Sequence, residues 1–333
     1  MKILITGGLG YIGSHTAIQF INAGHEILIV DNLSNSKLDV YKSIKSITKT
    51  DFSFEELDLC ETKALISVFS SFLPDAVIHF AGLKAVGESV EDPIKYYDNN
   101  VGGSISLLKA MEHSGCHKIL FSSSATVYGV PEYLPFDEQH RLDPINPYGQ
   151  SKLMTELVLK DWAKSKETNQ AIILRYFNPV GAHKSGFIGE DPLGVPNNLM
   201  PFISQVASGR LEELKVFGSD YDTRDGTGER DYIHVEDLSR AHLLSLNNIN
   251  KIDSIDYFNV GTGSGYTVLE CIKAYEKESG KNIKYTLAAR RDGDVSISYA
   301  SANKIKEFCD WSPEFDLEAM CKDSWNWECK TSI

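Results

Sequence analysis

The sequence predicts an α/β protein with a doubly wound parallel sheet and a smaller C-terminal α/β domain. Three observations predict it. Short apolar runs of strand character alternate with helical patterns through the first half of the chain. A glycine-rich turn follows the first apolar run, and an acidic residue follows the second. Such alternation is typical of βαβ units, whose helices cover both faces of a parallel sheet. We expect residues 1–177 to form the first domain and 178–333 mainly the second, with later segments such as 232–247 returning to the first.

The first strand and the turn after it predict a dinucleotide site. Residues 2–6 (KILIT) run directly into Gly7, Gly10 and Gly13, and a helix is expected over 14–23. Three glycines at this spacing let the backbone turn tightly and approach a pyrophosphate at the helix N-terminus. This is the Rossmann pattern; the alternative is a structural turn without a ligand.

The second strand predicts which dinucleotide binds. Residues 26–30 (EILIV) end at Asp31, eighteen residues after Gly13. A carboxylate there accepts hydrogen bonds from the adenosine ribose hydroxyls and repels a 2′-phosphate. We therefore expect NAD rather than NADP.

The remaining elements follow from the same patterns. Further strands are expected at residues 52–57, 76–79, 118–122 and 171–176. Helical periodicity returns at residues 235–247, 267–279 and 317–327. Between them, residues 178–201 and 220–231 are rich in glycine, proline, asparagine and charge, and long irregular segments of this kind are usually functional or disordered. We expect them to be loops of the substrate-holding domain.

Tyr148 and Lys152 form the principal catalytic candidate. Four residues apart on a helix, they share one face, where the ammonium would lower the pKa of the phenol and make it a usable base. A tyrosine that exchanges a proton beside a nicotinamide ring is a redox catalyst. The alternative is a surface tyrosine and a solvated lysine.

Composition and charge exclude some classes of partner. The chain has 333 residues, 42% hydrophobic and 24% charged, with a net charge of −13. This acidic balance argues against nucleic acid or an anionic membrane as a partner. No apolar run approaches the roughly 20 residues of a membrane helix, and the first residues do not resemble a signal peptide, so we expect a cytoplasmic protein.

The cysteines indicate neither a metal nor a disulfide framework. All six lack a CxxC pair or histidines at ligand spacing, and we expect reduced thiols and no metal site. They are Cys60, Cys116, Cys271, Cys309, Cys321 and Cys329.

Longer strings carry a family resemblance over essentially the whole chain. They are GGLGYIGSHT (7–16), DNLSNS (31–36), HFAGLKAVGES (79–89), FSSSATVYG (121–129), NPYGQSKLMTE (146–156), RYFNPVGAH (175–183), NNLMP (197–201) and GERDYIHVEDL (228–238). The sequence resembles the extended short-chain dehydrogenase/reductase family, and within it the UDP-glucose (UDP-galactose) 4-epimerases.

The resemblance implies a set of cofactor residues, matched position by position. The pyrophosphate and adenosine side would be held by Gly7, Gly10, Tyr11, Ile12, Gly13, Asp31, Asn32, Leu33, Ser34, Asn35, Ser36, Asp58 and Leu59. The nicotinamide side would be held by Phe80, Ala81, Gly82, Leu83, Lys84, Asn99, Tyr148, Lys152 and Phe177.

It also implies the catalytic and substrate residues. The catalytic set would be Ser124, Tyr148 and Lys152. The UDP-sugar would be held by Ser124, Asn178, Asn198, Arg230, Arg291, Asp294 and Ser298. Arginines offer fork-shaped donors to a diphosphate, the charge-assisted contact that an acidic protein needs for an anionic substrate. The alternative is a surface ion pair, such as Arg230 with Asp231.

The implied reaction is an NAD-dependent isomerisation of galactose metabolism. Tyr148 would take the 4-hydroxyl proton while NAD takes the C4 hydride, with Ser124 on the same oxygen, and the 4-keto sugar would turn before hydride returns. One rival is a nucleotide-sugar 4,6-dehydratase or decarboxylase. The dehydratase needs an acid and a base beside the Ser124 position, where this chain has Ala125 and Thr126. A second rival is a catalytically silent NAD-sensing protein, which intact catalytic residues disfavour.

Ser298 predicts the breadth of the substrate range. Relatives restricted to non-acetylated sugars resemble one another in a bulky tyrosine four residues after the aspartate of RRxGD, and counting from Asp294 that position is Ser298 here. A small residue leaves room for an N-acetyl group, so we expect UDP-GalNAc and UDP-GlcNAc to react as well. The alternative is that Tyr299 is the gate. The resemblance further implies a homodimer joined by residues 98–113 and 148–164.

Overall fold

The computed structural model describes residues 1–191, 196, 198–291 and 294–331. Its strands are β1 (Lys2–Thr6), β2 (Glu26–Asp31), β3 (Ser53–Glu56), β4 (Ala76–His79), β5 (Lys118–Ser124), β6 (Gln170–Tyr176), β7 (Asn178–Val180), β8 (Leu214–Phe217), β9 (Glu229–His234), β10 (Ile255–Val260), β11 (Gly265–Thr267), β12 (Tyr285–Ala288) and β13 (Ile297–Ser298). Its α-helices are α1 (Tyr11–Asn22), α2 (Leu38–Thr48), α3 (Thr62–Phe72), α4 (Val86–Glu91), α5 (Pro93–Tyr96), α6 (Gly103–Ser114), α7 (Pro147–Ser165), α8 (Leu199–Ala207), α9 (Val235–Asn247), α10 (Val268–Ser279), α11 (Asn303–Cys309) and α12 (Leu317–Thr331). Three short helical turns complete the list: the π-helical η1 (Tyr97–Gly102) and the 3₁₀ turns η2 (Ala125–Val127) and η3 (Ile249–Lys251).

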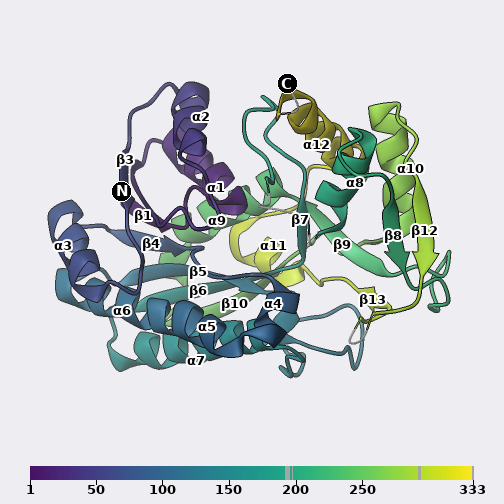
Figure 1. Cartoon of the computed structure of the whole chain (residues 1–333). Coiled ribbons are helices and arrows are strands. Elements are labelled where there is room, and N and C mark those ends of the chain that lie inside the picture. The colour runs from purple at the N-terminus through teal and green to yellow at the C-terminus, as the bar shows by residue number, and fades with distance from the viewer. Residues whose placement is uncertain (192–195, 197, 292–293, 332–333) are drawn as a thin grey trace.

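The large sheet confirms the predicted fold class. Seven strands pair in parallel in the order β10-β6-β5-β4-β1-β2-β3, with helices on both faces (Figure 1). The strands predicted from apolar runs all lie in this sheet within two residues of their expected ends. The sequence prediction lacked β10, whose residues Ile255–Val260 are only half buried at the start of the strand.

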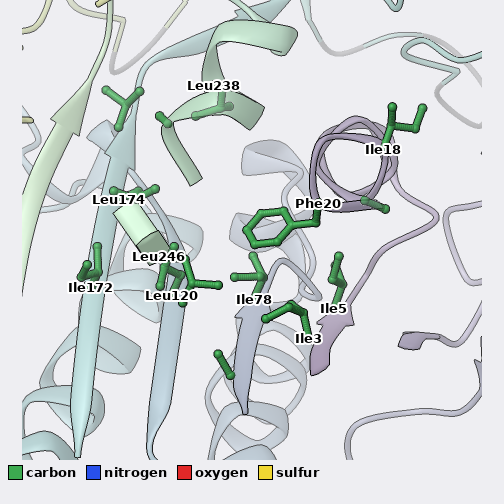
Figure 2. Close-up of a cluster of buried hydrophobic side chains, with 14 of the residues drawn as sticks. Ile3, Ile5, Ile18, Phe20, Ile78, Leu120, Ile172, Leu174, Leu238 and Leu246 are labelled. Atoms are coloured by element: carbon green, nitrogen blue, oxygen red, sulfur yellow. The ribbon is translucent and has the colours of Figure 1, made fainter. Parts of the chain in front are cut away.

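Two apolar cores lie on opposite faces of the sheet because successive strand residues point to opposite sides. Ile3 and Ile5 pack with helices α1 and α9 on one face, as Figure 2 shows for that cluster. Leu4 packs on the other face with residues of α3, α6 and α7. Because apolar side chains of β1 are buried on both faces of the sheet, a layer of helices must cover each face.

The second module lies beside the carboxyl edge of the sheet. Strand β9 pairs with β7, β11 and β13, and a third apolar cluster joins β7, β9 and β11 to α8, α10 and α12. Helix α9 follows β9 and returns to pack on α1. The division at residue 177 stays a prediction. Among the described residues, no helix is long and apolar enough to cross a membrane.

The chain order sets where a ligand can reach the sheet. Strands β2 and β3 lie on one side of β1, while β4 and the later strands lie on the other, so the direction of winding reverses between β1 and β4. Ligands of open α/β sheets bind beyond the carboxyl ends of the strands at such a reversal. The glycine turn after β1 and the segment after β4 meet there.

Candidate active site

The glycine turn has the shape that a phosphate-binding loop needs. Gly7 has φ of 65°, and a Cβ on it would lie 2.7 Å from the Ala81 amide nitrogen. A Cβ on Gly13 would lie 2.3 Å from the Gly7 carbonyl oxygen. Gly10 directly precedes α1 and has no side chain to cap it, so the amides of the first turn stay available for an anion. The residues present therefore fit a dinucleotide pyrophosphate.

Asp31 joins this turn to the loop after β2. Its Oδ2 accepts the Leu9 amide at 3.0 Å, while its Oδ1 accepts the Leu33 amide at 3.0 Å and the Ser36 hydroxyl at 2.7 Å. A carboxylate has about four acceptor sites, so these three donors leave capacity for a ribose hydroxyl. Leu33 has φ of 56°, a conformation that branched and bulky residues rarely adopt.

The predicted adenine side is built on Asp58. Asn32 donates to Asp58 Oδ2 at 2.8 Å, and the Cys60 amide donates to Asp58 Oδ1 at 2.8 Å. Burial raises the pKa of Asp58, but these hydrogen bonds outweigh it and lower the pKa below its ordinary value. The carboxylate is therefore ionised and fixed beside Leu59.

The predicted nicotinamide side depends on a residue that sequence reasoning missed. Buried Asn100 accepts the Leu83 amide at 2.7 Å and donates to the Leu83 carbonyl at 3.0 Å and to Ser151 Oγ at 2.9 Å. It thereby fixes the 80–84 segment against α7. Asn99, the residue that the resemblance implies, is the neighbour of Asn100 in the π-helical turn η1 and is half buried. Its contact with the cofactor stays a prediction.

The structure brings Ser124, Tyr148 and Lys152 together at the carboxyl end of β5. Ser124 ends that strand, and its Oγ accepts hydrogen bonds from Thr126 Oγ1 at 2.9 Å and the Thr126 amide at 3.2 Å. Helix α7 begins after Asn146, whose side chain accepts the Gly149 amide at 2.9 Å. This cap places Tyr148 in the first turn, in hydrogen-bond contact with Ser124.

Lys152 lies one turn further along α7. Its ammonium donates to the Ser122 carbonyl at 2.9 Å and lies 6.0 Å from the centre of the Tyr148 ring. Burial lowers the pKa of Lys152 to about 8, while Glu156 acts in the opposite direction. Protonation of this lysine is therefore sensitive to pH near neutrality.

The pKa of Tyr148 is set differently from the sequence prediction. The spacing predicts that Lys152 lowers it. In the structure, burial raises the pKa of Tyr148 above its ordinary value and the hydrogen bond with Ser124 lowers it, while the ammonium bonds the Ser122 carbonyl instead. Ser124 is thus the residue that favours the phenolate here.

Arg230 is not the surface ion pair considered as its alternative. Its Nη1 donates to the Glu229 carbonyl at 2.9 Å. The Asp231 carboxylate lies on the opposite side of β9, fully buried, and accepts hydrogen bonds from Thr262 at 2.7 Å and the Gly263 amide at 3.0 Å. The hydrogen bonds of Arg230 among the described residues go to backbone carbonyls, so its guanidinium has spare donors.

Arg291 and Asp294 lie together, but they bind each other. Arg291 Nε donates to Asp294 Oδ2 at 2.8 Å, and Asn198 donates to Glu190 Oε1 at 2.7 Å. Ser298 pairs with Arg230 in the parallel register of β13 and β9. Of the motif positions, Asn197, Asp292 and Gly293 lie outside the described residues.

The other predicted residues are placed as follows. Tyr11 begins α1 and donates through its hydroxyl to the Gly181 carbonyl at 2.7 Å, and Lys84 pairs with Glu190 at 3.0 Å. Phe177 is buried between β6 and β7, and Asn178 begins β7. Ile12 is the second residue of α1, and those in the turns beyond β2 and β4 are Ser34, Asn35, Phe80 and Gly82.

Comparison with known proteins gives a consistent result. A family model described as GDP-mannose 4,6 dehydratase matches residues 4–324. The UDP-glucose 4-epimerase of Bacillus subtilis (strain 168) is 53% identical over 328 residues, which cover 98% of this chain and 97% of that protein.

Solved structures agree over the whole length. UDP-glucose 4-epimerase from Stenotrophomonas maltophila, with bound NAD and formylated UDP-arabinopyranose, has a TM-score of 0.97 and 44% identity and covers 100% of this chain and 99% of its own. The UDP-Glc/GlcNAc 4-epimerase of Campylobacter jejuni has a TM-score of 0.86 and 41% identity and covers 99% of each chain.

Proposed function

Because the chain belongs to the UDP-glucose 4-epimerase family, we propose that it interconverts UDP-galactose and UDP-glucose by inverting C4 of the hexose. The observation that carries this proposal is the cluster of Ser124, Tyr148 and Lys152 at the carboxyl end of β5, the strand next to β4. The resemblance found in the sequence is confirmed at the level of the family.

The cofactor is NAD, which when bound accepts and returns the C4 hydride. Gly7, Gly10 and Gly13 would hold its pyrophosphate, and Asp31 its adenosine ribose. Structural relatives with bound NAD support this assignment. The cofactor is regenerated in each cycle, so a site that retains it suits the reaction.

The chain's own residues handle the proton. Tyr148 takes the 4-hydroxyl proton as the 4-keto sugar forms and returns it afterwards. Ser124 bonds the tyrosine and reaches the same oxygen, while Thr126 donates two hydrogen bonds to Ser124 Oγ and so fixes its position. Buried Lys152 supplies positive charge beside the phenol.

The dehydratase alternative is weaker despite the description of the matching family model. Loss of water across C5 and C6 needs an added acid and base beside Ser124. Ala125 and Thr126 occupy that turn, and Thr126 is already committed to Ser124. The same intact contacts disfavour a silent NAD-sensing protein.

UDP would be anchored by two arginines that have different partners in the structure. Arg230 has donors to spare, whereas Arg291 must exchange Asp294 for phosphate or share it. Asp294 would then be free to accept from the UDP ribose. A firm grip on UDP with a loosely held hexose lets the keto sugar turn within the site.

Ser298 supports activity on the N-acetylated pair. Paired residues of neighbouring strands project from the same face, so Ser298 lies on the face that carries Arg230. If Arg230 binds the diphosphate, a small side chain beside it leaves room near the sugar. A similar protein described as a UDP-Glc/GlcNAc 4-epimerase supports the dual range.

The functional unit would be a homodimer. Helices α6 and α7 expose Ile105 at 38%, Met154 at 37% and Leu157 at 50%. A second copy would cover these apolar side chains, which lie within the two segments predicted for the interface. A cytoplasmic location remains a prediction.

Turnover by the purified protein tests the proposal. UDP-galactose and UDP-N-acetylgalactosamine are supplied side by side, and the glucose-configured products are quantified by anion-exchange chromatography. Product from neither substrate would refute the proposed function, and product from UDP-galactose alone would refute the N-acetyl activity.

A further inference from the structure

Beneath the catalytic cluster lies a buried ion pair that the reaction scheme does not use. Glu156 on α7 and Arg175 on β6 have side-chain exposures of only 2% and 3%. Arg175 Nε donates to Glu156 Oε1 at 3.0 Å and Nη2 donates to Oε2 at 2.6 Å, a bidentate arrangement. Such a pair is weak evidence for stability, because its desolvation cost rivals its attraction and apolar replacements are often neutral.

The pair reaches the elements that carry the catalytic residues. Glu156 lies four residues after Lys152 and eight after Tyr148, on the same face of α7. Its Oε1 also accepts the Ser123 hydroxyl at 2.5 Å, and Ser123 directly precedes Ser124 on β5. One carboxylate therefore fixes the catalytic helix against the end of the strand that bears the catalytic serine.

The arginine extends this connection across the sheet. Arg175 Nη1 donates to the Tyr128 hydroxyl at 3.3 Å, and that hydroxyl donates to Asn259 Oδ1 at 2.6 Å. The guanidinium also lies 4.8 Å from the centre of the Tyr257 ring. One guanidinium on β6 thus contacts α7, β10 and Tyr128 in the segment after β5.

We propose that Glu156 and Arg175 are positioning residues, which hold Tyr148 and Lys152 on α7 at the spacing from Ser124 that proton transfer requires. The proposal rests on the proposed function. Displacement of reacting groups by about 1 Å costs on the order of 100-fold in rate, so a pair that fixes α7 against β5 acts on kcat rather than on substrate binding.

Glu156 also acts on Lys152 electrostatically. The groups that face the Lys152 ammonium are Tyr148 and Glu156 from α7 and His79 from β4. Burial lowers the pKa of His79 to about 3, so that imidazole is neutral near pH 7. Glu156 raises the pKa of Lys152, so loss of its charge moves that pKa downward.

The test uses the holoenzyme and variants that separate charge from geometry. Glu156→Gln keeps the shape and removes the charge, Arg175→Lys keeps the charge and removes the bidentate fork, and Ser123→Ala removes only the bond to β5. The double variant Glu156→Leu/Arg175→Met replaces the pair without leaving a buried charge unpaired. Glu112→Gln is the matched control, because Glu112 binds the far end of α7 through Trp162 at 2.8 Å.

The expected result is a loss of kcat without a loss of affinity. Glu156→Gln and the double variant should lose about 10- to 100-fold in kcat for UDP-galactose, with KM and UDP affinity within about threefold of the parent. The alkaline limb of kcat should move to lower pH in both. Ser123→Ala should lose several-fold in kcat with that limb unmoved, Arg175→Lys should be intermediate, and Glu112→Gln should match the parent.

A folded double variant with parental kcat would overturn the proposal. If Glu156→Gln does not fold, the double variant and Ser123→Ala still decide it. An independent readout is the pKa of Lys152, followed by NMR of ¹³Cε-labelled lysine and assigned with Lys152→Arg. A parent without turnover would refute the proposed function, whereas a parent that turns over and a folded double variant with the same kcat would refute the positioning pair.

Discussion

Substitution of Ser298 by tyrosine tests the substrate range most directly. Ser298 lies in the two-residue strand β13, opposite Arg230 of β9, and is half buried. A tyrosine there would project a ring from the same face as the guanidinium. Because aromatic residues are favoured in strands and this position is at an edge, we expect little change in stability.

The magnitude follows from steric overlap. Excess volume in a close-packed site costs roughly 1–3 kcal/mol, which corresponds to roughly a 5- to 150-fold loss in kcat/KM. Only the substrates with an acetamido group at C2 should pay this cost. UDP-galactose should keep a kcat/KM within about twofold of the parent, because its hydroxyl occupies less space.

The assay compares kcat/KM for UDP-galactose and UDP-N-acetylgalactosamine in parent and variant. Ser264→Tyr, an exposed substitution before β11, controls for a bulky residue nearby. A parent that ignores the acetylated substrate, or an equal loss on both substrates, would refute the reasoning. A ratio that changes with Tyr299→Ala but not with Ser298→Tyr would identify Tyr299 as the gate.

Three further perturbations test the site and the core. Tyr148→Phe should lower kcat by roughly 10²- to 10⁴-fold while UDP affinity survives, because the phenol serves proton transfer; a kcat within a few-fold of the parent would contradict this. The parent should carry NAD without added cofactor. Asp31→Asn should retain less NAD, because it loses acceptors for the Leu9 amide and the ribose. Nucleotide released by acid measures the NAD content, and equal content in parent and variant would count against a role of Asp31 in cofactor binding. Burial lowers the pKa of His15 and His79 to about 3 and of His242 to about 4, from an ordinary value of 6.5. Between about pH 4 and pH 6.5 only the unfolded chain binds protons on these histidines. The free energy of unfolding should therefore fall as the pH drops below 6.5, by up to about 4 kcal/mol per pH unit for three protons. A melting temperature that stays constant from pH 6.5 to 4.5 would contradict this.

Local patterns were sufficient for the large sheet apart from β10. The expectation that residues 178–201 and 220–231 are loops was wrong in part, because residues 178–180 form β7, residues 199–201 begin α8 and residues 229–231 begin β9. The strand at residues 76–79 and the helix at 235–247 were predicted with the bounds that β4 and α9 have. Strand β10 was missed because an edge strand is only partly buried and lacks a continuous apolar run. The start of α1 was placed late because Tyr11 and Ile12 already belong to the helix, which begins directly after Gly10.

The site was less predictable because its energetics depend on contacts between distant segments. The spacing of Tyr148 and Lys152 placed them on one face, but the partner of the ammonium is the carbonyl of Ser122, thirty residues earlier. Likewise, Asn100 lies in the π-helical turn η1 and accepts the amide of Leu83, seventeen residues earlier. No short sequence pattern specifies either contact.

The chain has a net charge of −13, and both predicted ligands, NAD and the UDP-sugar, contain a diphosphate. Each site must therefore offset the repulsion between an acidic protein and an anionic ligand. At the cofactor side the donors are backbone amides around Gly10, which carry no charge and need no carboxylate partner. At the substrate side Arg230 binds backbone carbonyls, so its charge stays available, whereas Arg291 holds Asp294 in an exposed pair, of a type that contributes only about 0–1 kcal/mol. Replacement of the Arg291–Asp294 pair by a contact between Arg291 and phosphate therefore costs little free energy. In both sites, local hydrogen-bond donors offset the repulsion between the acidic chain and the diphosphate.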